Sequence, residues 1–477
     1  MKFEAVIGLE VHAQLLTESK IFCACPNRFG AGANSQVCPI CAGMPGTLPV
    51  LNKKVVELAL RMAIATHCDV KQRSVFARKN YFYPDLPKGY QVSQYERPLC
   101  EKGYLDILPA DGKPRRIQLT RIHLEEDAGK SIHDRSDDET YVDFNRCGTP
   151  LIEIVTDPVI HTAEEAFLYL TQLKQILQYL EVCDGNMEEG SLRCDANVSI
   201  RPVGQTTLGT KTELKNMNSF HNVEKAIKHE IDRQIQLVES GGRVIQQTLL
   251  WDADKGIARP MRDKEEANDY RYFPEPDLMD VIVEPEWVAE IRKSLPALPE
   301  ERIQRYQSEW GLPEYDATVL TEERKVADFF ERAAKSTAHI KTLSNWMMGE
   351  VLRLSKESGG LSQIRIVPEA LSELVNLIEK GTITGKIAKT VFEHMAQSGD
   401  SPISIIEKQN LSVVTDEGEL LSIIRAILEK NPSQVDQYKA GKTKILGFFV
   451  GEIMKATRGK ANPAVVNPLL EKTLASS

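Results

Sequence analysis

The sequence lacks any apolar run that approaches the roughly 18 residues of a membrane span. Its first residues, Met1 to Glu4, lead directly into a strand pattern rather than into the apolar core of a signal peptide. Its nine cysteines are an odd number, which suits reduced thiols or metal ligands better than a disulfide framework. We therefore expect a cytoplasmic protein with no membrane partner.

An excess of positive charge is also missing, since the net charge is −9. A protein that coats nucleic acid without specificity is basic overall, so this class is disfavoured, although a local basic patch stays open. Internal repeats and low-complexity segments are absent. The apolar content of 42% and the charged content of 27% are those of an ordinary globular protein, and 477 residues suffice for two or three domains.

A phosphate-binding loop of the common type is missing too. Residues 127–131 (DAGKS) and 440–443 (AGKT) resemble the end of such a loop. The loop also requires a glycine five positions before the glycine that precedes its lysine, and Leu124 and Asp436 stand at those positions. Any ATP site in this chain must therefore be of another kind.

The first 290 residues or so mix strand and helix patterns. Apolar residues alternate over 191–200, which predicts a strand, and helical periodicity appears at 163–180 and 222–239. Two prolines interrupt residues 294–299, which we interpret as a linker.

After this linker the chain becomes helical. Amphipathic spacing predicts helices over 299–310, 322–336, 341–357, 368–380 and 384–396. Residues 399–402 (GDSP) form a second break, and the remainder is again helical. We predict an α+β fold of three parts: a large sheet-and-helix domain, an all-helical domain and a small helical tail domain, over 1–293, 294–402 and 403–477.

Four of the nine cysteines stand as two close pairs joined by a turn-rich loop: Cys23, Cys25, Cys38 and Cys41. Such pairs can place four thiolates tetrahedrally on one Zn²⁺, whereas the alternative is four unrelated reduced thiols. Four thiolates leave no open coordination position. We therefore predict a structural zinc that holds a loop over 22–42.

Residues 5–15 (AVIGLEVHAQL) alternate between apolar and other residues, which predicts a half-buried strand. Its second face carries Glu10 and His12 side by side. A solvated polar face is the simplest interpretation of one such strand. A carboxylate and an imidazole on one face also suit a metal or phosphate site. The choice between the two interpretations depends on the other acidic residues of the chain.

Several acids stand where burial or clustering makes them candidates for a cation site. Glu153 interrupts a continuous apolar run, so it needs a cation, a metal or a raised pKa, and a buried salt bridge with an arginine is the alternative. Glu125 and Glu126 stand near a strand end, where a solvated loop is the alternative, and Asp195 lies on the polar face of its strand. With Glu10 and His12, these carboxylates suit one or two hard cations such as Mg²⁺.

Two loops combine cations with aromatic residues, over 77–91 and 269–277. They can stack bases and neutralise phosphates, or they can pin proline-rich turns to the core. Near the C-terminus, helical spacing over 446–454 predicts one apolar face. Cations lie opposite it, as expected for contacts to an RNA backbone or for a merely solvated face: Lys444, Lys455 and Arg458.

Taken in order, these motifs make the chain similar, from end to end, to the B subunits of the heterotrimeric tRNA-dependent amidotransferases. The segments that carry the resemblance most specifically are 6–12 (VIGLEVH), 78–85 (RKNYFYPD), 125–130 (EEDAGK), 148–153 (GTPLIE), 188–197 (EEGSLRCDAN) and 269–277 (DYRYFPEPD). The two cysteine pairs match the zinc-carrying branch of that family.

The resemblance implies a cradle-shaped catalytic domain, a helical domain and a tRNA-binding tail domain. It implies partners, namely the glutaminase or A subunit, which releases ammonia, and the C subunit. It also implies a reaction in which Glu misattached to tRNA(Gln), or Asp misattached to tRNA(Asn), is converted into the amide. The B subunit would use ATP and Mg²⁺ to phosphorylate the side-chain carboxylate, which channelled ammonia then amidates.

The same resemblance assigns roles to residues of this chain. The catalytic pocket would hold Glu10, His12, Glu125, Glu126 and Glu153. Of these, Mg²⁺ would be bound by Glu10, His12, Glu126 and Glu153. Arg78 and Lys79 would counter either the transferred phosphate or the acceptor end of the tRNA, and Asp195 is placed with them as a cofactor-binding residue. The body of the tRNA would be contacted by Lys444, Lys455 and Arg458.

Two other functions stay open at this level. A zinc-containing scaffold that binds tRNA would use its acids only for structural salt bridges. A Mg²⁺-dependent phosphohydrolase would need no basic C-terminal surface. The sequence does not decide between Glu-tRNA(Gln) and Asp-tRNA(Asn) as substrate.

Overall fold

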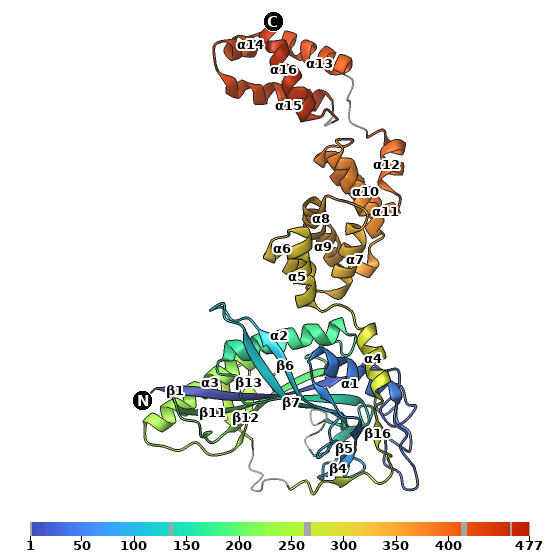
Figure 1. Cartoon of the computed structure of the whole chain (residues 1–477), viewed down its shortest axis with the longest axis vertical. Coiled ribbons are helices and arrows are strands. Elements are labelled where there is room, and N and C mark those ends of the chain that lie inside the picture. Colours follow the sequence, from blue (N-terminus) through green and yellow to red (C-terminus); the bar gives the residue numbers. More distant parts are fainter. Residues whose placement is uncertain are drawn as a thin grey trace. The chain divides into compact units, whose positions relative to one another are not determined.

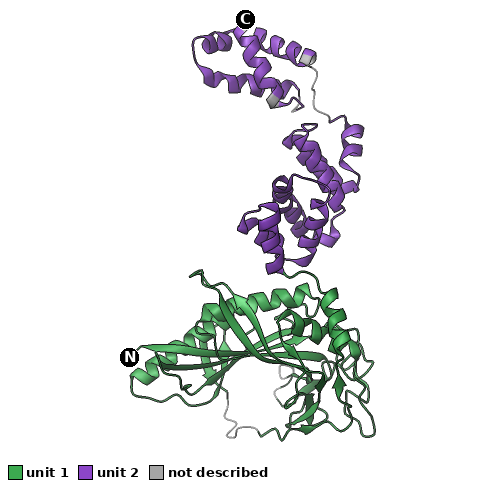
Figure 2. Cartoon of the chain, in the orientation of Figure 1, with its two compact units in different colours: residues 1–298 green, residues 299–477 purple. Residues whose placement is uncertain are grey.

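The computed structural model describes residues 2–132, 136, 138–261, 269–411, 417–457 and 460–476. Two compact units, 1–298 and 299–477, make up the chain (Figure 2). Most of the predicted linker belongs to the first unit, because Leu295 and Leu298 pack against its hydrophobic core. Among the described helices, none has both the length and the apolar character that crossing a membrane requires.

A nine-stranded sheet forms the centre of the first unit, and its strands pair antiparallel except β12 with β13. In spatial order the strands are β14 (Ile257–Pro260), β13 (Thr248–Asp252), β12 (Thr212–Lys215), β11 (Leu192–Pro202), β1 (Phe3–Gln14), β10 (Pro150–Thr156), β7 (Arg115–Glu126), β6 (Cys100–Ile107) and β2 (Asp69–Val70). The alternation that predicts strands over 5–15 and 191–200 corresponds to β1 and β11.

Helices cover one face of this sheet (Figure 1). They are α1 (Lys53–Ala65), α2 (Ala163–Tyr179) and α3 (Phe220–Glu239). Thr162 and Ser219 fix the starts of α2 and α3, because each hydroxyl accepts a hydrogen bond from a first-turn backbone N–H. The alternate apolar side chains of β1 are buried in the core of this unit: Ala5, Ile7, Leu9, Val11 and Ala13. Packing of this face therefore sets the orientation of every strand, and with it the opposite, polar face.

Smaller elements complete the first unit. A three-stranded sheet of β15 (Phe273–Pro274), β4 (Ala77–Asn80) and β5 (Tyr90–Ser93) contacts β7 through β5. Two short pairs and one helix are added: β3 (Arg73–Ser74) with β16 (Val281–Ile282), β8 (Lys130–Ile132) with β9 (Tyr141–Asp143), and α4 (Pro285–Ser294).

The described part of the second unit is helical and contains two hydrophobic cores. The first core is built from α5 (Pro299–Trp310), α6 (Glu314–Leu320), α7 (Arg324–Ala334), α8 (Ile340–Trp346), a π-helical turn (Met347–Val351), α9 (Leu352–Ser358), α10 (Pro368–Glu379), α11 (Gly385–Ser398) and α12 (Pro402–Gln409). The second is built from α13 (Glu417–Lys430), α14 (Pro432–Lys439), α15 (Leu446–Ala456) and α16 (Pro463–Ser476). Helix α12 packs on the first core through Ile405 and Ile406, although the sequence-based boundary assigns it to the tail.

Candidate active site

The polar face of the nine-stranded sheet brings residues from distant parts of the chain into one row. His12 on β1 pairs with Glu153 on β10, and Glu153 pairs with His123 on β7. Directly paired residues of antiparallel strands project on the same face, so these three side chains point the same way. On the opposite face their neighbours, such as Val11 and Ile154, are fully buried under the helices.

Three side chains of this face form a compact acidic cluster. His12 Nε2 lies 3.2 Å from Glu125 Oε1 and 3.6 Å from Glu153 Oε2. One ligand atom from each residue lies within 4.8 Å of the others, an arrangement that can hold a metal ion. Both carboxylates are buried, and among the described residues neither forms an ion pair with an arginine or a lysine. The expected alternative, an arginine salt bridge to Glu153, is therefore not found in this part of the chain.

The cluster shifts the pKa values of its members strongly. Burial lowers the pKa of His12, but hydrogen bonds to Glu125 and Glu153 outweigh this and raise it to about 10. For Glu125, burial raises the pKa, but hydrogen bonds from His12 and His123 bring it well below its usual value. Burial likewise raises the pKa of Glu153, but His123 and His12 hold it well below its usual value, so both carboxylates are ionised and His12 is protonated. A cation that binds here needs the ionised carboxylates, and it must displace the proton of His12 before that ring can be its ligand.

His123 also belongs to this site, although no sequence motif singled it out. Its Nε2 lies 3.1 Å from Glu153 Oε2 and 3.8 Å from Glu125 Oε2, and the side chain is only 2% exposed. The available indication was its position two residues before Glu125 on one strand, which places both on the same face. Burial lowers the pKa of His123, but Glu153 and Glu125 outweigh this and raise it above its usual value, so the imidazolium form balances the charge of the carboxylates.

Glu10 and Asp195 lie beside the cluster on the same face, since they pair with each other across β1 and β11. Glu10 accepts a hydrogen bond of 2.9 Å from Asn197, and Asp195 lies 3.0 Å from Lys215 Nζ. Burial and then the nearby Glu153 carboxylate raise the pKa of Glu10. These two acids extend the acidic cluster without belonging to its three closest ligands.

Glu126 is not brought into the cluster, although it adjoins Glu125 in sequence. Its carboxylate pairs with the Lys88 ammonium and accepts a hydrogen bond of 2.9 Å from the backbone N–H of Val92. Adjacent residues of a strand point to opposite faces, which separates the two acids. Glu126 therefore joins β7 to the β5 segment.

The two predicted phosphate-binding cations on β4 differ in their surroundings. Arg78 forms a bidentate pair with Glu275, with both distances 2.8 Å, and lies 3.2 Å from Asp277. Lys79 has no such partner among the described residues. Burial lowers its pKa, but Glu125 and other neighbours outweigh this, so that the pKa lies above its usual value. Lys79 is thus a cation that the negative charges of Glu125 and Glu153 stabilise without a direct ion pair to either.

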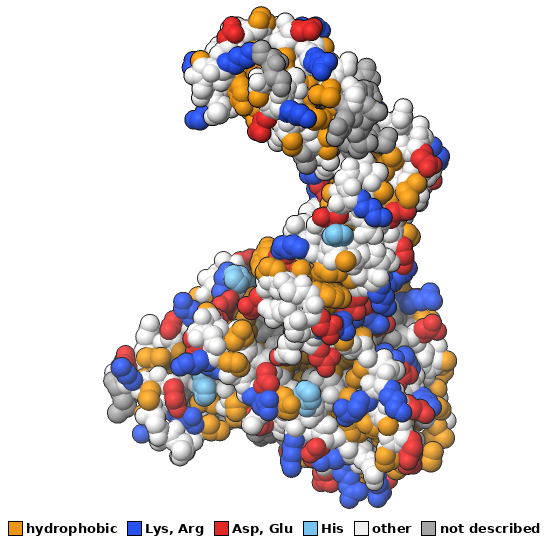
Figure 3. Space-filling model, turned by 45° about the horizontal axis from the view of Figure 1, so that its top comes forward, with side chains coloured by type: hydrophobic (Ala, Val, Ile, Leu, Met, Phe, Trp, Pro, Cys, Tyr) orange, Lys and Arg blue, Asp and Glu red, His pale blue; other side chains and the backbone are white. Residues whose placement is uncertain are grey.

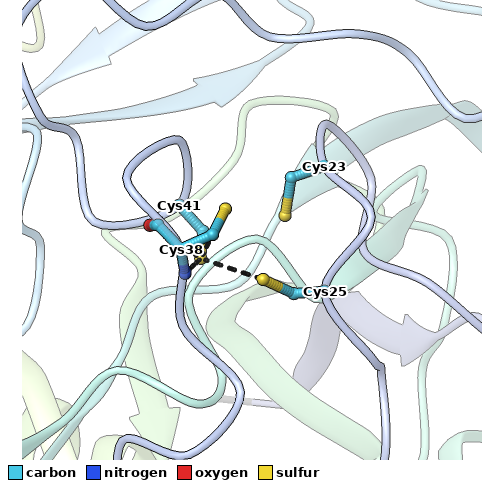
Figure 4. Close-up of side chains that lie close together, drawn as sticks. All are labelled: Cys23, Cys25, Cys38 and Cys41. Carbon is cyan, nitrogen blue, oxygen red and sulfur yellow. Dashed lines mark hydrogen bonds between the residues drawn. The ribbon is translucent and has the colours of Figure 1, made fainter.

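The four cysteines of the predicted zinc site come together (Figure 4). Their sulfurs all lie within 4.8 Å of one another, and Cys41 Sγ lies 4.0 Å from Cys25 Sγ and 3.9 Å from Cys38 Sγ. In a tetrahedron of Zn–S bonds of about 2.3 Å, sulfurs stand about 3.8 Å apart. The sulfur geometry is therefore compatible with one zinc ion.

At the edge of the site, Asp127 holds two arginines in place. It accepts hydrogen bonds of 2.7 Å from Arg146 and 3.1 Å from Arg193, and it is 6% exposed. Burial raises the pKa of Asp127, but the two guanidinium groups outweigh this and hold it below its usual value. The pair of salt bridges fixes the loop after β7 to β11.

Replacement of this carboxylate should destabilise the first unit. We expect Asp127→Asn to lower the free energy of unfolding at pH 7 by about 3 kcal/mol, since two partly buried cations lose their counter-charge. Because the pKa of Asp127 is lower in the folded than in the unfolded protein, its ionised form stabilises the folded state above the unfolded-state pKa of about 3.9. This stabilisation is lost as the pH falls through the folded-state pKa. Urea unfolding should thus show the difference from wild type at pH 7 and its shrinkage below about pH 4. Asp106→Asn, at an exposed pair with Arg116, is the control; an equal loss there would contradict a special role for Asp127.

Two of the three predicted tRNA-contacting residues, Lys444 and Lys455, lie at the surface of the helices that build the second core. On α15, Phe449 and Ile453 are buried, and Lys455 is exposed, 3.9 Å from Glu452. Lys444 is exposed on a short 3₁₀ turn just before this helix, and Arg458 lies outside the described residues. On the face shown in Figure 3, Lys and Arg side chains over these C-terminal helices are interspersed with hydrophobic ones and a few acids.

Family models and known proteins match this chain over nearly its whole length. Residues 5–289 match the family described as the GatB/GatE catalytic domain, and residues 328–474 match the GatB domain. The chain is 56% identical over 478 residues to a protein of Geobacter sulfurreducens, 55% over 475 residues to one of Thermoanaerobacter pseudethanolicus, and 54% over 475 residues to one of Thermodesulfovibrio yellowstonii. Each match covers 99% of this chain and all of the relative. All three relatives are named as the B subunit of an aspartyl/glutamyl-tRNA(Asn/Gln) amidotransferase.

Proposed function

Because the chain belongs to the GatB family, which includes the B subunits of the tRNA-dependent amidotransferases, we propose that it performs the ATP-dependent step of that reaction. The side-chain carboxylate of Glu-tRNA(Gln) or Asp-tRNA(Asn) attacks the γ-phosphorus of ATP, and ADP leaves. Ammonia then attacks the acyl phosphate, and phosphate leaves as the amide forms. The chain acts in the cytoplasm as one part of a glutamine-dependent ligase, together with the glutaminase (A) and C subunits.

The acidic cluster of His12, Glu125 and Glu153 is the observation that carries this proposal. Two buried carboxylates converge on His12, with His123 beside them and without a guanidinium or ammonium partner among the described residues. This donor set fits a divalent cation such as Mg²⁺. When bound, Mg²⁺ supplies charge neutralisation and alignment for the phosphates of ATP. Three protein ligands leave room for those phosphate oxygens.

The chain's own residues position the reactants and balance charge. Phosphoryl transfer needs alignment and electrostatic stabilisation more than a protein nucleophile, which agrees with an acidic site that has no serine or cysteine triad. Lys79 supplies a positive charge opposite the cluster for the transferred phosphoryl group. Glu10 and Asp195 extend the acidic site along the same face of the sheet. Arg78 acts indirectly, since its pair with Glu275 holds β4 in place.

The four-cysteine cluster holds a structural Zn²⁺ in this proposal. Four thiolates fill its coordination sphere, so the ion takes no part in the reaction. Its role is to fix the loop over 22–42, which contributes Cys41 to the same pocket wall as Lys88 and Glu126.

We propose that the C-terminal helices hold the body of the tRNA. Exchanging Lys444 and Lys455 together for alanine should weaken tRNA binding about tenfold and reduce the slope of log K against log salt by about 2, because each phosphate contact releases one counterion. A salt titration of tRNA binding measures both quantities. Lys356→Ala, on an exposed position of α9, is the control, and an equal effect there would contradict a specific contact.

The experiment that tests the function is amidation of Glu-tRNA(Gln) by the reconstituted complex, with Mg²⁺-ATP and ammonium. Ammonium bypasses the glutaminase, so the assay isolates the chemistry of this chain. We expect Gln-tRNA from the wild type, and tRNA binding without product from Glu10→Ala. Equal turnover by both would remove Glu10 from the mechanism. Failure of the wild type with both Glu-tRNA(Gln) and Asp-tRNA(Asn) would favour a non-catalytic tRNA-binding scaffold.

A further inference from the structure

Arg121 lies on the polar face of the sheet, next to the acidic cluster. It pairs with Val155 across β7 and β10, and His123 follows two residues later on the same strand. Strand alternation therefore directs the Arg121 side chain to the face that carries His123 and Glu125. Neither the predicted site residues nor the proposed chemistry uses this arginine.

Its guanidinium group has no counter-charge in the described part of the chain. Arg121 Nε is buried and has no hydrogen-bond partner. The acid directly across from it, Glu101, is paired with Lys71 at 2.8 Å instead. A buried N–H without an acceptor is costly, so a molecule that supplies acceptors there gains binding energy.

Three other arginines of this region are held by carboxylates, whereas Arg121 forms no ion pair among the described residues. Arg146 and Arg193 share Asp127, and Arg78 is held by Glu275. A planar guanidinium with free N–H groups is the side chain that binds phosphate in a bidentate manner.

A pair of tyrosines adjoins this arginine. The guanidinium carbon of Arg121 lies 5.9 Å from the centre of the Tyr95 ring, and Tyr95 stacks on Tyr272 with centroids 4.2 Å apart and planes 3° apart. Both tyrosines line a cavity of about 290 Å³ together with Phe273 and with charged side chains that include Arg73, Arg97 and Asp280. Arg121 adjoins this cavity through its contact with Tyr95. This volume is near the lower end of small-molecule sites, and its aromatic walls suit a planar base.

We infer that Arg121 binds a phosphate of an adenine nucleotide whose base packs against the aromatic cavity of Tyr95, Tyr272 and Phe273. The inference rests on the proposed function, which brings two such nucleotides to this face: ATP and the 3′-terminal adenosine of tRNA. Both present the same chemistry, an anionic phosphate attached to an adenosine. The phosphate accepts hydrogen bonds from the N–H groups of Arg121 and lies close to the acidic cluster.

The test measures binding of Mg²⁺-ATP by the reconstituted complex, without turnover, for wild type and Arg121→Gln. Loss of a charge-assisted pair should weaken the relevant nucleotide about tenfold to hundredfold. Arg121→Lys keeps the charge without the planar fork and should fall in between. Arg116→Gln, on the same strand but paired with Asp106 at the surface, should bind as wild type. Because Arg121 has no ion-pair partner among the described residues, its replacement should not lower the melting temperature.

A second arm identifies the source of the nucleotide, by comparing uncharged tRNA(Gln) with the same tRNA lacking its terminal adenosine. Weaker Mg²⁺-ATP binding with unchanged tRNA binding assigns the site to ATP. Unchanged Mg²⁺-ATP binding, together with a variant that no longer distinguishes the two tRNAs, assigns the site to the acceptor end of the tRNA. Unchanged affinity for both ligands overturns the inference, as does a loss of both accompanied by a lower melting temperature. Failure of the wild type to bind either ligand would instead refute the proposed function.

Discussion

Glu153→Gln is expected to reduce amidation of Glu-tRNA(Gln) about 10³-fold, whether ammonium or glutamine supplies the nitrogen. The substitution keeps the size of the side chain but removes one of the two buried negative charges that face His12. A divalent cation and the phosphates that it aligns would lose a principal ligand. Single-turnover formation of Gln-tRNA in the reconstituted complex measures the effect, together with tRNA affinity, which should not change.

Glu4→Gln is the matched control for this variant. Glu4 also lies on the nine-stranded sheet, on the strand that carries His12, but it pairs with Arg201 away from the cluster. Its replacement should leave amidation within a factor of about two of wild type, as is usual for a surface ion pair. If Glu153→Gln retained wild-type turnover, the acidic cluster would be a structural charge pair and the scaffold alternative would gain support.

Cys41→Ser is expected to abolish zinc binding and to loosen the loop over 22–42. Cys41 is the buried member of the cluster and lies within 4.0 Å of two other sulfurs, so a shorter, harder hydroxyl there removes one ligand of a closed site. Metal analysis should find one zinc per wild-type chain and a small fraction of that in the variant. Trypsin should then cleave after Arg28, which lies within the loop.

Cys68→Ser provides the comparison for the zinc site, because Cys68 is a free thiol outside the four-cysteine cluster. It should keep full zinc content and wild-type resistance after Arg28. Zinc retained by Cys41→Ser, or lost equally from both variants, would contradict a four-thiolate site. Amidation should fall less than the zinc content does, since the ion holds a loop and does not contact the reactants.

The four-cysteine cluster and the acidic face were predictable from the sequence for different reasons. The two cysteine pairs are joined by one short loop, so the loop alone can bring their sulfurs together, and the spacing in the sequence is enough to predict the cluster. For β1, a period of two residues is enough to place Glu10 and His12 together on one face. Both predictions depend on local geometry, and local geometry is what a single sequence encodes most directly.

Contacts between distant segments were not predictable in this way. Glu125 and Glu126 are equivalent in the sequence, and only the strand register shows that Glu125 meets His12 while Glu126 meets Lys88. From the sequence alone Arg78 is a candidate phosphate ligand, but in the folded chain its guanidinium group is paired with Glu275. In the second unit, helix α6 (Glu314–Leu320) was missed, because seven residues are too few for a helical period to stand out.

The central claim is that this chain's site activates the substrate carboxylate by transferring a phosphoryl group to it. The most direct test uses Glu-tRNA(Gln) whose side-chain carboxylate carries ¹⁸O, with unlabelled ATP, ammonium and the reconstituted complex. Attack of the carboxylate on the γ-phosphorus leaves one carboxylate oxygen on the phosphate that ammonia displaces. We predict one ¹⁸O in each phosphate released per Gln-tRNA formed, by mass spectrometry. Phosphate without ¹⁸O would show that ATP is hydrolysed apart from the carboxylate, and would contradict the claim.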